Sequence, residues 1–167
     1  FTDYSGSIAD PINSAGYLHE IYTAAKPDYT GRVTVPVLWD KEKKTIVNNE
    51  SAEIIRIFNS EFSEFGDSTL DFYPEDLRDE IDRINAVVYD SINNGVYKCG
   101  FATTQEAYEE AFHKLFKTLD EIETILSKNR YLVGNKLTEA DWRLFTTLLR
   151  FDSVYYSHFK CNLRRIE

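Results

Sequence analysis

The sequence feature that most constrains this fold is a proline inside a short valine-rich segment. Residues 33–40 read VTVPVLWD, so Pro36 lies between Val35 and Val37. The β-branched residues predict a strand, but proline has no amide hydrogen and fits a strand only at an edge, at a bulge or in a special turn. A cis peptide bond before Pro36 is one way to keep the strand direction while exposing backbone groups to a ligand.

A hairpin turn and a helix start follow this segment directly. The charged run 40–44 predicts the turn, and residues 45–53 (TIVNNESAE) predict a second strand and then a helix that opens at Glu50 and Ser51. The first N–H groups of a helix have no partners within it and attract a carboxylate. Glu50 can hold an amine, so the two residues together suit an amino-acid zwitterion. On local sequence alone, a simple helix cap formed by Asn49 or Ser51 is the alternative.

The second half of the chain has the apolar spacing of amphipathic helices. Pro74 is placed in the first turn of a long helix, which we expect to end at residues 93–95 (NNG). Thr103 or Thr104 then caps a second long helix, in which the apolar side chains recur at helical spacing. These patterns predict a bundle of helices for this half of the chain.

A capping box opens one further helix. Thr138 and Asp141 have the spacing at which each side chain bonds to the backbone of the other residue. The box is a signal of helix nucleation and adds no chemistry. We expect bulky residues to bury this helix on several sides, namely Trp142, Leu144, Phe145, Leu148 and Leu149.

Composition argues against two classes of partner. The formal net charge of −9 argues against nucleic acid, because a phosphate backbone requires a basic face. No apolar run approaches the roughly 18 residues that a membrane span needs. The two cysteines, Cys99 and Cys161, form no CxxC pair, which fits a reducing cytoplasm. Each is expected to be a small buried hydrophobe, although Lys98 is placed to lower the pKa of the Cys99 thiol.

Three long segments resemble one known family. Residues 33–62, 93–108 and 137–165 are similar, in this order, to the glutathionyl-hydroquinone reductases, the Xi class of the glutathione transferase superfamily. The resemblance implies an α/β plus all-α fold of the glutathione-transferase type. It implies a partial thioredoxin-like, glutathione-binding domain with an N-terminal connector at residues 1–64, a linker at 65–73 and a helical-bundle domain at 74–167.

One motif of that family is missing from this sequence. The family carries its nucleophilic cysteine in a Cys-Pro-Trp-Ala motif, and no such run occurs among the 167 residues. We therefore expect the chain to begin after that motif and to stop before the last helices of the family. On its own it is expected to be inactive.

The resemblance assigns glutathione contacts to five residues. Ser51 would bind the α-carboxylate of the γ-glutamyl group and Glu50 its α-amine. The backbone of Val35, beside Pro36, would pair with the cysteinyl part of glutathione as an added strand does. Arg32 would reach the glycyl carboxylate. A solvated arginine at the end of a strand is an equally weighted alternative for this residue.

The resemblance also implies a second substrate, a hydroquinone that contacts Tyr97 and Tyr155. Tyr97 is placed in the turn after residues 93–95, and a phenolic hydroxyl there can donate to a quinol oxygen. Tyr156 is the rival of Tyr155, but neighbours in a helix point about 100° apart, so only one of them faces the pocket. His158 is expected to be a buried structural histidine.

The function implied is the glutathione-dependent reduction of glutathionyl-hydroquinones. A cysteine thiolate would attack the glutathione sulfur and release hydroquinone, and a second glutathione would resolve the mixed disulfide. The partners implied are glutathione as co-substrate, a glutathionyl-hydroquinone and a second copy in a cytoplasmic homodimer, with no metal. A non-catalytic binding or assembly module of the same fold is the main alternative. An ordinary conjugating transferase, with a tyrosine or serine activating glutathione, is a weaker one.

Overall fold

The structure is a computed structural model that describes residues 5–167. The chain divides into two compact units, Phe1–Ser68 and Thr69–Glu167, which are described separately. The division falls within residues 65–73, where a linker is predicted. No helix in the described part of the chain is long and apolar enough to cross a membrane.

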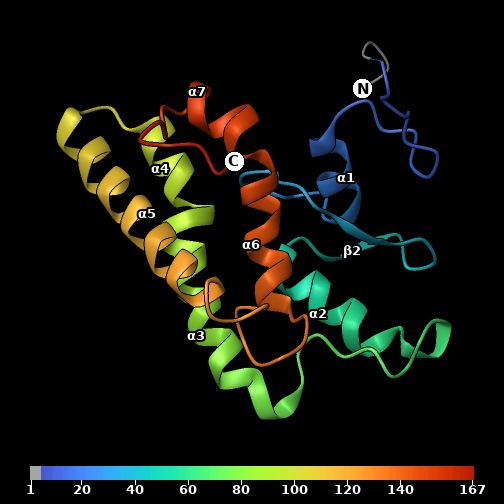
Figure 1. Cartoon of the computed structure of the whole chain (residues 1–167). Coiled ribbons are helices and arrows are strands. Elements are labelled where there is room, and N and C mark those ends of the chain that lie inside the picture. Colours follow the sequence, from blue (N-terminus) through green and yellow to red (C-terminus); the bar gives the residue numbers. More distant parts are fainter. Residues whose placement is uncertain (1–4) are drawn as a thin grey trace. The chain divides into compact units, whose positions relative to one another are not determined.

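The first unit contains a small antiparallel sheet and two helices (Figure 1). Its elements are α1 (Leu18–Ala25), β1 (Leu38–Asp40), β2 (Thr45–Asn48), α2 (Ser51–Glu61) and the 3₁₀ turn η1 (Ser63–Phe65). Trp39 pairs with Ile46, which confirms the predicted hairpin. The Asp40 carboxylate closes the turn by accepting the N–H groups of Glu42 and Lys43 at 2.9 and 2.8 Å.

The valine-rich segment forms less strand than its composition predicts. The strand begins only at Leu38, and its register shifts between Leu38 and Trp39. The peptide bond between Val35 and Pro36 is cis, as considered from the sequence. In place of a neighbouring strand, a tyrosine side chain bonds to the backbone of Thr34. The buried Tyr22 hydroxyl donates to the Thr34 carbonyl at 2.7 Å and accepts from the Thr34 N–H at 3.3 Å.

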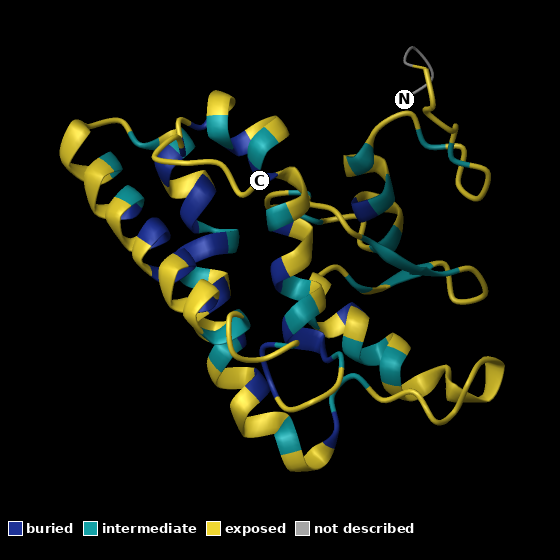
Figure 2. Ribbon diagram, viewed as in Figure 1, coloured by how far each residue is buried: buried dark blue, intermediate teal, exposed yellow. Residues whose placement is uncertain are grey.

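The second unit is a bundle of helices. Its elements are η2 (Glu75–Leu77), α3 (Arg78–Val88), the π turn η3 (Tyr89–Asn93), α4 (Gly95–Phe101), α5 (Gln105–Leu126), α6 (Glu139–Arg150), the π turn η4 (Phe151–Tyr155) and α7 (Tyr156–His158). Helix α5 packs on α4 and η3, and α6 packs on α3. The inward faces of these helices carry the buried residues (Figure 2), including Ile81, Leu115 and Phe151 at 0 % exposure.

The first long helix was predicted to end at residues 93–95, but the structure shows that it continues. Asn94 is helical with φ −84°, and the chain continues through Gly95 into α4. Gly95 is buried against α5, where an added Cβ would lie 3.7 Å from Leu115 Cδ1. The glycine therefore permits a close approach of two helices rather than a left-handed helix end, and Tyr97 lies on α4 rather than in a turn.

Two predicted helix starts are confirmed, those of α5 and α6, whereas Pro74 is the N-cap of η2 rather than a residue in the first turn of α3, which begins at Arg78. Thr104 caps α5 by accepting the Ala107 N–H at 3.2 Å. Thr138 and Asp141 form the capping box of α6, with the Thr138 N–H 2.9 Å from Asp141 Oδ2. The other oxygen of Asp141 accepts the Leu132 N–H at 2.9 Å, so the box also anchors the loop before the helix.

Helix α6 is buried on one face, not on several sides as expected. Leu144 is buried, whereas Trp142, Phe145 and Leu149 are 46 %, 49 % and 68 % exposed. Polar contacts help to hold the buried face: Glu139, only 4 % exposed, accepts from Asn85 Nδ2 at 2.9 Å. An apolar pattern alone could not show which of its sides would be covered.

Candidate functional site

The cis-proline segment and the start of α2 lie next to each other in the first unit. The side-chain amide of Asn49 donates to the Thr34 hydroxyl at 3.3 Å and joins the two segments. Val35 and Pro36 directly follow Thr34, and the helix begins two residues after Asn49. The sequence signals for these segments therefore describe one local structure.

The start of α2 leaves polar groups available for a ligand. The N-cap is Glu50, whose side chain makes no capping bond, so neither Asn49 nor Ser51 is the cap. Asn48 fixes this end instead: its Oδ1 accepts the Glu50 N–H at 2.7 Å, and its Nδ2 donates to Glu53 at 2.5 Å. The Glu50 and Ser51 side chains are exposed and have no hydrogen-bond partner among residues 5–167.

The other residues proposed for glutathione lie on the segment before β1. Arg32, Val35 and Pro36 are exposed, Val35 by 76 %. The Tyr29 hydroxyl donates to the Arg32 carbonyl at 2.9 Å and fixes this backbone, whereas the Arg32 guanidinium has no partner in the described chain. A cation, open strand-like backbone and a helix start thus occur on consecutive segments, and these groups suit a ligand with two carboxylates and an amine.

The predicted tyrosines meet in the second unit. Tyr97 on α4 and Tyr155 on η4 place their hydroxyl oxygens 3.3 Å apart, and their rings are in edge contact with centroids 5.7 Å apart. Tyr155 is 2 % exposed and Tyr97 is 43 % exposed. Tyr156 turns elsewhere, with the Arg165 guanidinium 4.8 Å from its ring centroid. Only one of the two neighbouring tyrosines therefore joins Tyr97, and it is Tyr155.

A third polar residue, which was not predicted from the sequence, contacts this pair. Arg150 Nε donates to the Tyr155 hydroxyl at 3.2 Å. In an α-helix, residues five apart point about 140° away from each other, so the spacing gives no signal. The π turn η4 between them brings i and i+5 to the same side.

The neighbouring Tyr155 hydroxyl and burial keep the Tyr97 hydroxyl protonated. The interaction with Tyr155 raises the pKa of Tyr97 above its ordinary value, and partial burial raises this pKa further. A positive charge on Arg150 opposes this rise. Tyr97 is therefore a neutral hydrogen-bond donor at physiological pH.

Phe159 supports both tyrosine rings and packs against a glycine. Its ring centroid lies 5.2 Å from that of Tyr97 and 5.6 Å from that of Tyr155. Beneath it, a Cβ added at Gly100 would lie 2.4 Å from the ring and 2.9 Å from Phe159 Cβ. The glycine thus leaves the space that Phe159 fills.

We expect Gly100→Ala to destabilise the protein by about 1–3 kcal/mol, because the added methyl must displace Phe159 in a packed core. Alanine is favoured over glycine in a helix by about 1 kcal/mol, so a loss of stability would show that sterics dominate. Urea unfolding measures the change. Gly66→Ala is the matched control, since nothing lies within 4 Å of a Cβ at Gly66. Equal stabilities for Gly100→Ala and wild type would contradict this packing.

The remaining candidates for chemistry are structural or exposed. Cys99 and Cys161 are both buried, as expected. A hydrogen bond with Cys99, together with burial, raises the pKa of the Cys161 thiol. Lys98 does not act on Cys99 as expected, because its ammonium group donates to Asp90 Oδ1 at 2.6 Å. His158 is exposed, contrary to prediction, and its ring lies tilted against Phe159 with centroids 5.2 Å apart.

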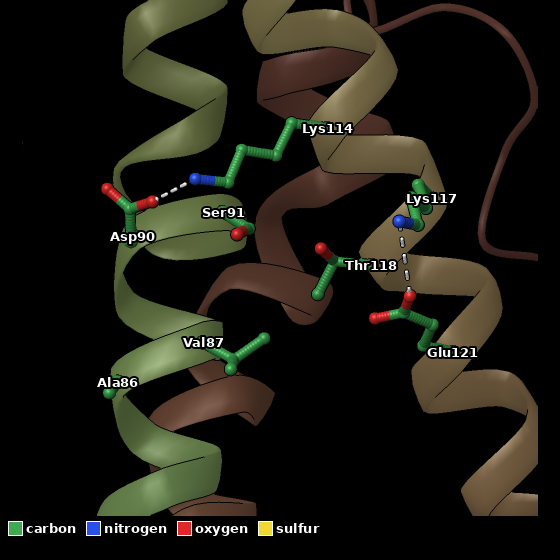
Figure 3. Close-up of a pocket in the computed structure, with 8 residues that line it drawn as sticks. All are labelled: Ala86, Val87, Asp90, Ser91, Lys114, Lys117, Thr118 and Glu121. Carbon is green, nitrogen blue, oxygen red and sulfur yellow. Dashed lines mark hydrogen bonds and ion pairs between the residues drawn. The ribbon is translucent and has the colours of Figure 1, made fainter.

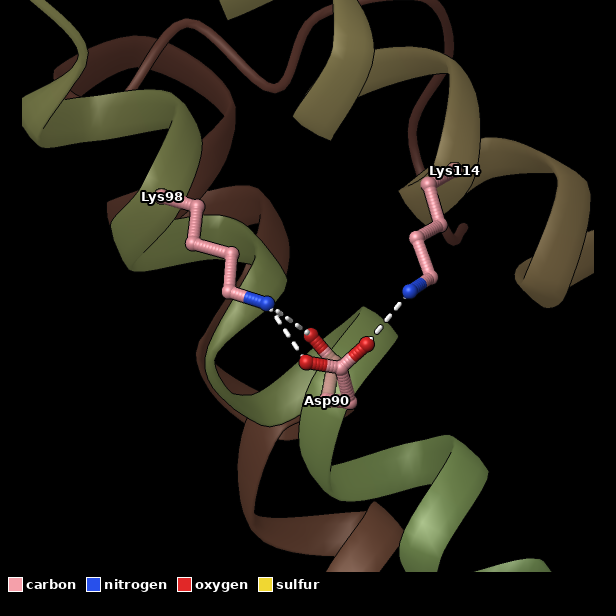
Figure 4. A network of polar contacts seen from close by, with 3 residues as sticks. All are labelled: Asp90, Lys98 and Lys114. Atoms are coloured by element: carbon pink, nitrogen blue, oxygen red, sulfur yellow. Dashed lines mark hydrogen bonds and ion pairs between the residues drawn. The ribbon is translucent and has the colours of Figure 1, made fainter. Parts of the chain in front are cut away.

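A shallow hollow of about 390 Å³ lies between α3, η3 and α5 in the second unit (Figure 3). Asp90 and Lys114 are among its lining residues, and Lys98 and Lys114 both bind Asp90 in an ion-pair network (Figure 4). The hydrogen bonds from Lys114 and then Lys98 lower the pKa of the Asp90 carboxyl to about 2. The network joins α4 and α5 to η3 and gives this hollow a structural role.

The Asp90 network predicts a pH-dependent contribution to stability. A carboxyl whose folded pKa lies below its unfolded pKa stabilises the fold above the unfolded value, and this contribution is lost as pH falls toward the folded value of about 2. We therefore expect Asp90→Asn to lower the thermal midpoint at pH 6, and the gap from wild type to narrow as the pH falls from about 4 to about 2. Glu123 has no ion pair in the described chain, so the difference in thermal midpoint between Glu123→Gln and wild type should not narrow in this way between about pH 4 and about pH 2. A gap for Asp90→Asn that stays constant would contradict the role of Asp90.

Known proteins match nearly the whole chain. The family profile "Glutathione S-transferase, C-terminal domain" matches residues 105–166. The glutathionyl-hydroquinone reductase PcpF of Sphingobium chlorophenolicum is 64% identical over 159 residues, which are 95% of this chain and 51% of PcpF. The crystal structure of glutathione transferase Xi 1 from Trametes versicolor superposes with a TM-score of 0.95 at 55% identity, over 99% of this chain and 57% of that one.

A glutathione-bound structure of YqjG, a glutathione transferase homologue from Escherichia coli K-12, has the same TM-score of 0.95 at 55% identity, over 98% of this chain and 53% of that one. These likenesses define the fold as that of a glutathione transferase, mostly helical with a small sheet. Within that superfamily, the chain belongs to the Xi class, the family of the glutathionyl-hydroquinone reductases. The chain spans about half the length of the curated relatives that it matches.

Proposed function

We propose that the protein carrying this chain is a glutathione-dependent reductase of glutathionyl-hydroquinones. The observation that carries the proposal is the start of α2 beside the cis Val35–Pro36 bond, where the Glu50 and Ser51 side chains have no hydrogen-bond partner among residues 5–167, in a chain 64% identical to a reductase of this kind. A simple structural cap would use its own side chain, and this one does not.

In this proposal the first unit binds glutathione. Ser51, through its N–H and hydroxyl, receives the γ-glutamyl carboxylate, and Glu50 pairs with the α-amine. The backbone of Val35, beside Pro36, pairs with the cysteinyl residue, and Arg32 binds the glycyl carboxylate. Binding of glutathione by the YqjG homologue supports this assignment.

The second unit supplies Tyr97 and Tyr155 for the hydroquinone. A phenol that donates to an oxygen of the aromatic ring stabilises the charge that develops there as sulfur leaves. The attacking thiolate comes from neither Cys99 nor Cys161, because both thiols are buried in the core of this unit. The reaction requires another cysteine, the role that the Cys-Pro-Trp-Ala motif has in the family.

The wider organisation is part of the same proposal. We assign residues 1–64 to a thioredoxin-like domain with its connector, 65–73 to a linker and 74–167 to the helical domain. The protein would act as a homodimer in the cytoplasm, without a metal. Each of these assignments follows from resemblance to the family.

The test is an assay of the full-length protein with glutathionyl-menadiol and glutathione, in which chromatography measures the hydroquinone released. Ser51→Ala removes one hydrogen bond to a charged group, about 1.5–3 kcal/mol, so the KM for glutathione should rise about 10- to 100-fold. Ser60→Ala is the matched control on the same helix, since within residues 5–167 its hydroxyl bonds only to groups of α2. Absence of hydroquinone release from wild type would refute the reductase and favour the binding module.

A further inference from the structure

The two tyrosine hydroxyls could each donate to the other, but only one direction gives the buried Tyr155 proton an acceptor among the described residues. Arginine has no acceptor, so the Arg150 Nε–H donates to the Tyr155 oxygen, 3.2 Å away. Tyr155 is 2 % exposed, and its other polar neighbour among the described residues is the Tyr97 hydroxyl at 3.3 Å. A buried hydroxyl hydrogen needs an acceptor, and therefore Tyr155 donates to Tyr97.

This direction determines where the Tyr97 proton points. The Tyr97 oxygen accepts from Tyr155, so its own hydrogen must turn away from the pair. Tyr97 is 43 % exposed, whereas Tyr155 is buried, and Tyr97 is the last residue in the series of hydrogen bonds that starts at Arg150. The rings hold this geometry, because Phe159 contacts both of them.

We propose that Arg150 is a positioning residue that orients the relay formed by the hydrogen bonds from Arg150 to Tyr155 and from Tyr155 to Tyr97. In this orientation the Tyr97 hydroxyl donates to an oxygen of the bound hydroquinone. Arg150 touches neither substrate in this scheme and acts through Tyr155. The inference rests on the proposed function for the identity of the ligand, but the direction of the relay is a property of the ligand-free protein. The positive charge of Arg150 also favours donation from Tyr155 to Tyr97, since it polarises the Tyr155 O–H group.

The first test needs no substrate. In the full-length protein labelled with ¹³Cζ-tyrosine, NMR follows the titration of Tyr97, which Tyr97→Phe identifies. Arg150→Met removes the charge that lowers the pKa of Tyr97, so the titration midpoint of Tyr97 should rise. Arg150→Lys should stay nearer to wild type. Arg83→Met is the matched control, because Arg83 is an exposed arginine whose only ion pair within residues 5–167 is with Glu80 at 3.9 Å. A midpoint that is unchanged in Arg150→Met would overturn the proposal.

The second test uses the reaction. Arg150→Met should lower kcat about 10-fold with an unchanged KM for glutathione, and it should cost nothing further in a Tyr155→Phe background, because Arg150 acts through that hydroxyl. Losses that multiply in the double variant would overturn the relay. Wild type without activity but with the expected titration shift would refute the reductase and keep the relay, whereas active wild type with no shift would do the reverse.

Discussion

Replacing Tyr155 with phenylalanine is expected to lower kcat for hydroquinone release about 100-fold and to leave the KM for glutathione nearly unchanged. The substitution keeps the ring that packs on Phe159 and removes only the hydroxyl, 3.3 Å from that of Tyr97. Loss of a positioned proton donor or its support costs about 10²-fold or more in rate. Steady-state kinetics on the full-length protein, with each substrate varied in turn, provides the measurement.

Tyr156→Phe is the matched control for this prediction. It removes the same atom from the neighbouring residue, whose ring lies under Arg165 rather than against Tyr97. We expect full activity. If Tyr155→Phe instead abolished glutathione binding while kcat stayed unchanged, the assignment of Tyr155 to the hydroquinone would be wrong.

Replacing Phe151 with alanine is expected to lower the free energy of unfolding by about 3–5 kcal/mol. The Phe151 side chain has 0 % exposure and meets Phe116 and Tyr155 in edge contacts, with centroids 6.2 and 6.4 Å away. Its removal would leave a cavity beside the tyrosine pair, so a fall in activity should accompany the loss of stability. Chemical unfolding in urea, followed by tyrosine and tryptophan fluorescence, measures the effect.

Leu149→Ala controls for the general effect of shortening an apolar side chain near this point. Leu149 lies two residues earlier and is 68 % exposed, so the expected change is within about 0.5 kcal/mol. Equal losses for the two variants would mean that Phe151 is not the centre of the core described here.

The two π turns explain why part of the second unit could not be predicted from its pattern. The spacing of apolar residues correctly predicted the helix before residues 89–93 and the long helix α5, but it did not predict α4, because an ordinary helical repeat cannot anticipate the extra residue in η3. Gly95 was therefore predicted to end a helix, although its proximity to Leu115 shows that it allows two helices to pack closely. The same limit concealed Arg150, because η4 alters the phase between it and Tyr155.

What the sequence alone determined is local chemistry. It identified the interruption at Pro36, the helix start at Ser51 and the capping box of Thr138 with Asp141, because each depends on groups only a few residues apart. The resemblance to one family also came from the sequence.

Only the tertiary structure decided which residues far apart in the chain come together. Tyr97 and Tyr155 are 58 residues apart, and they meet because α4 and η4 belong to one packed core. Burial on a single face of α6 and the contact of Arg150 with Tyr155 were decided in the same way. Contacts of this kind depend on how whole helices pack, and this packing is the sum of many weak interactions that no short segment encodes.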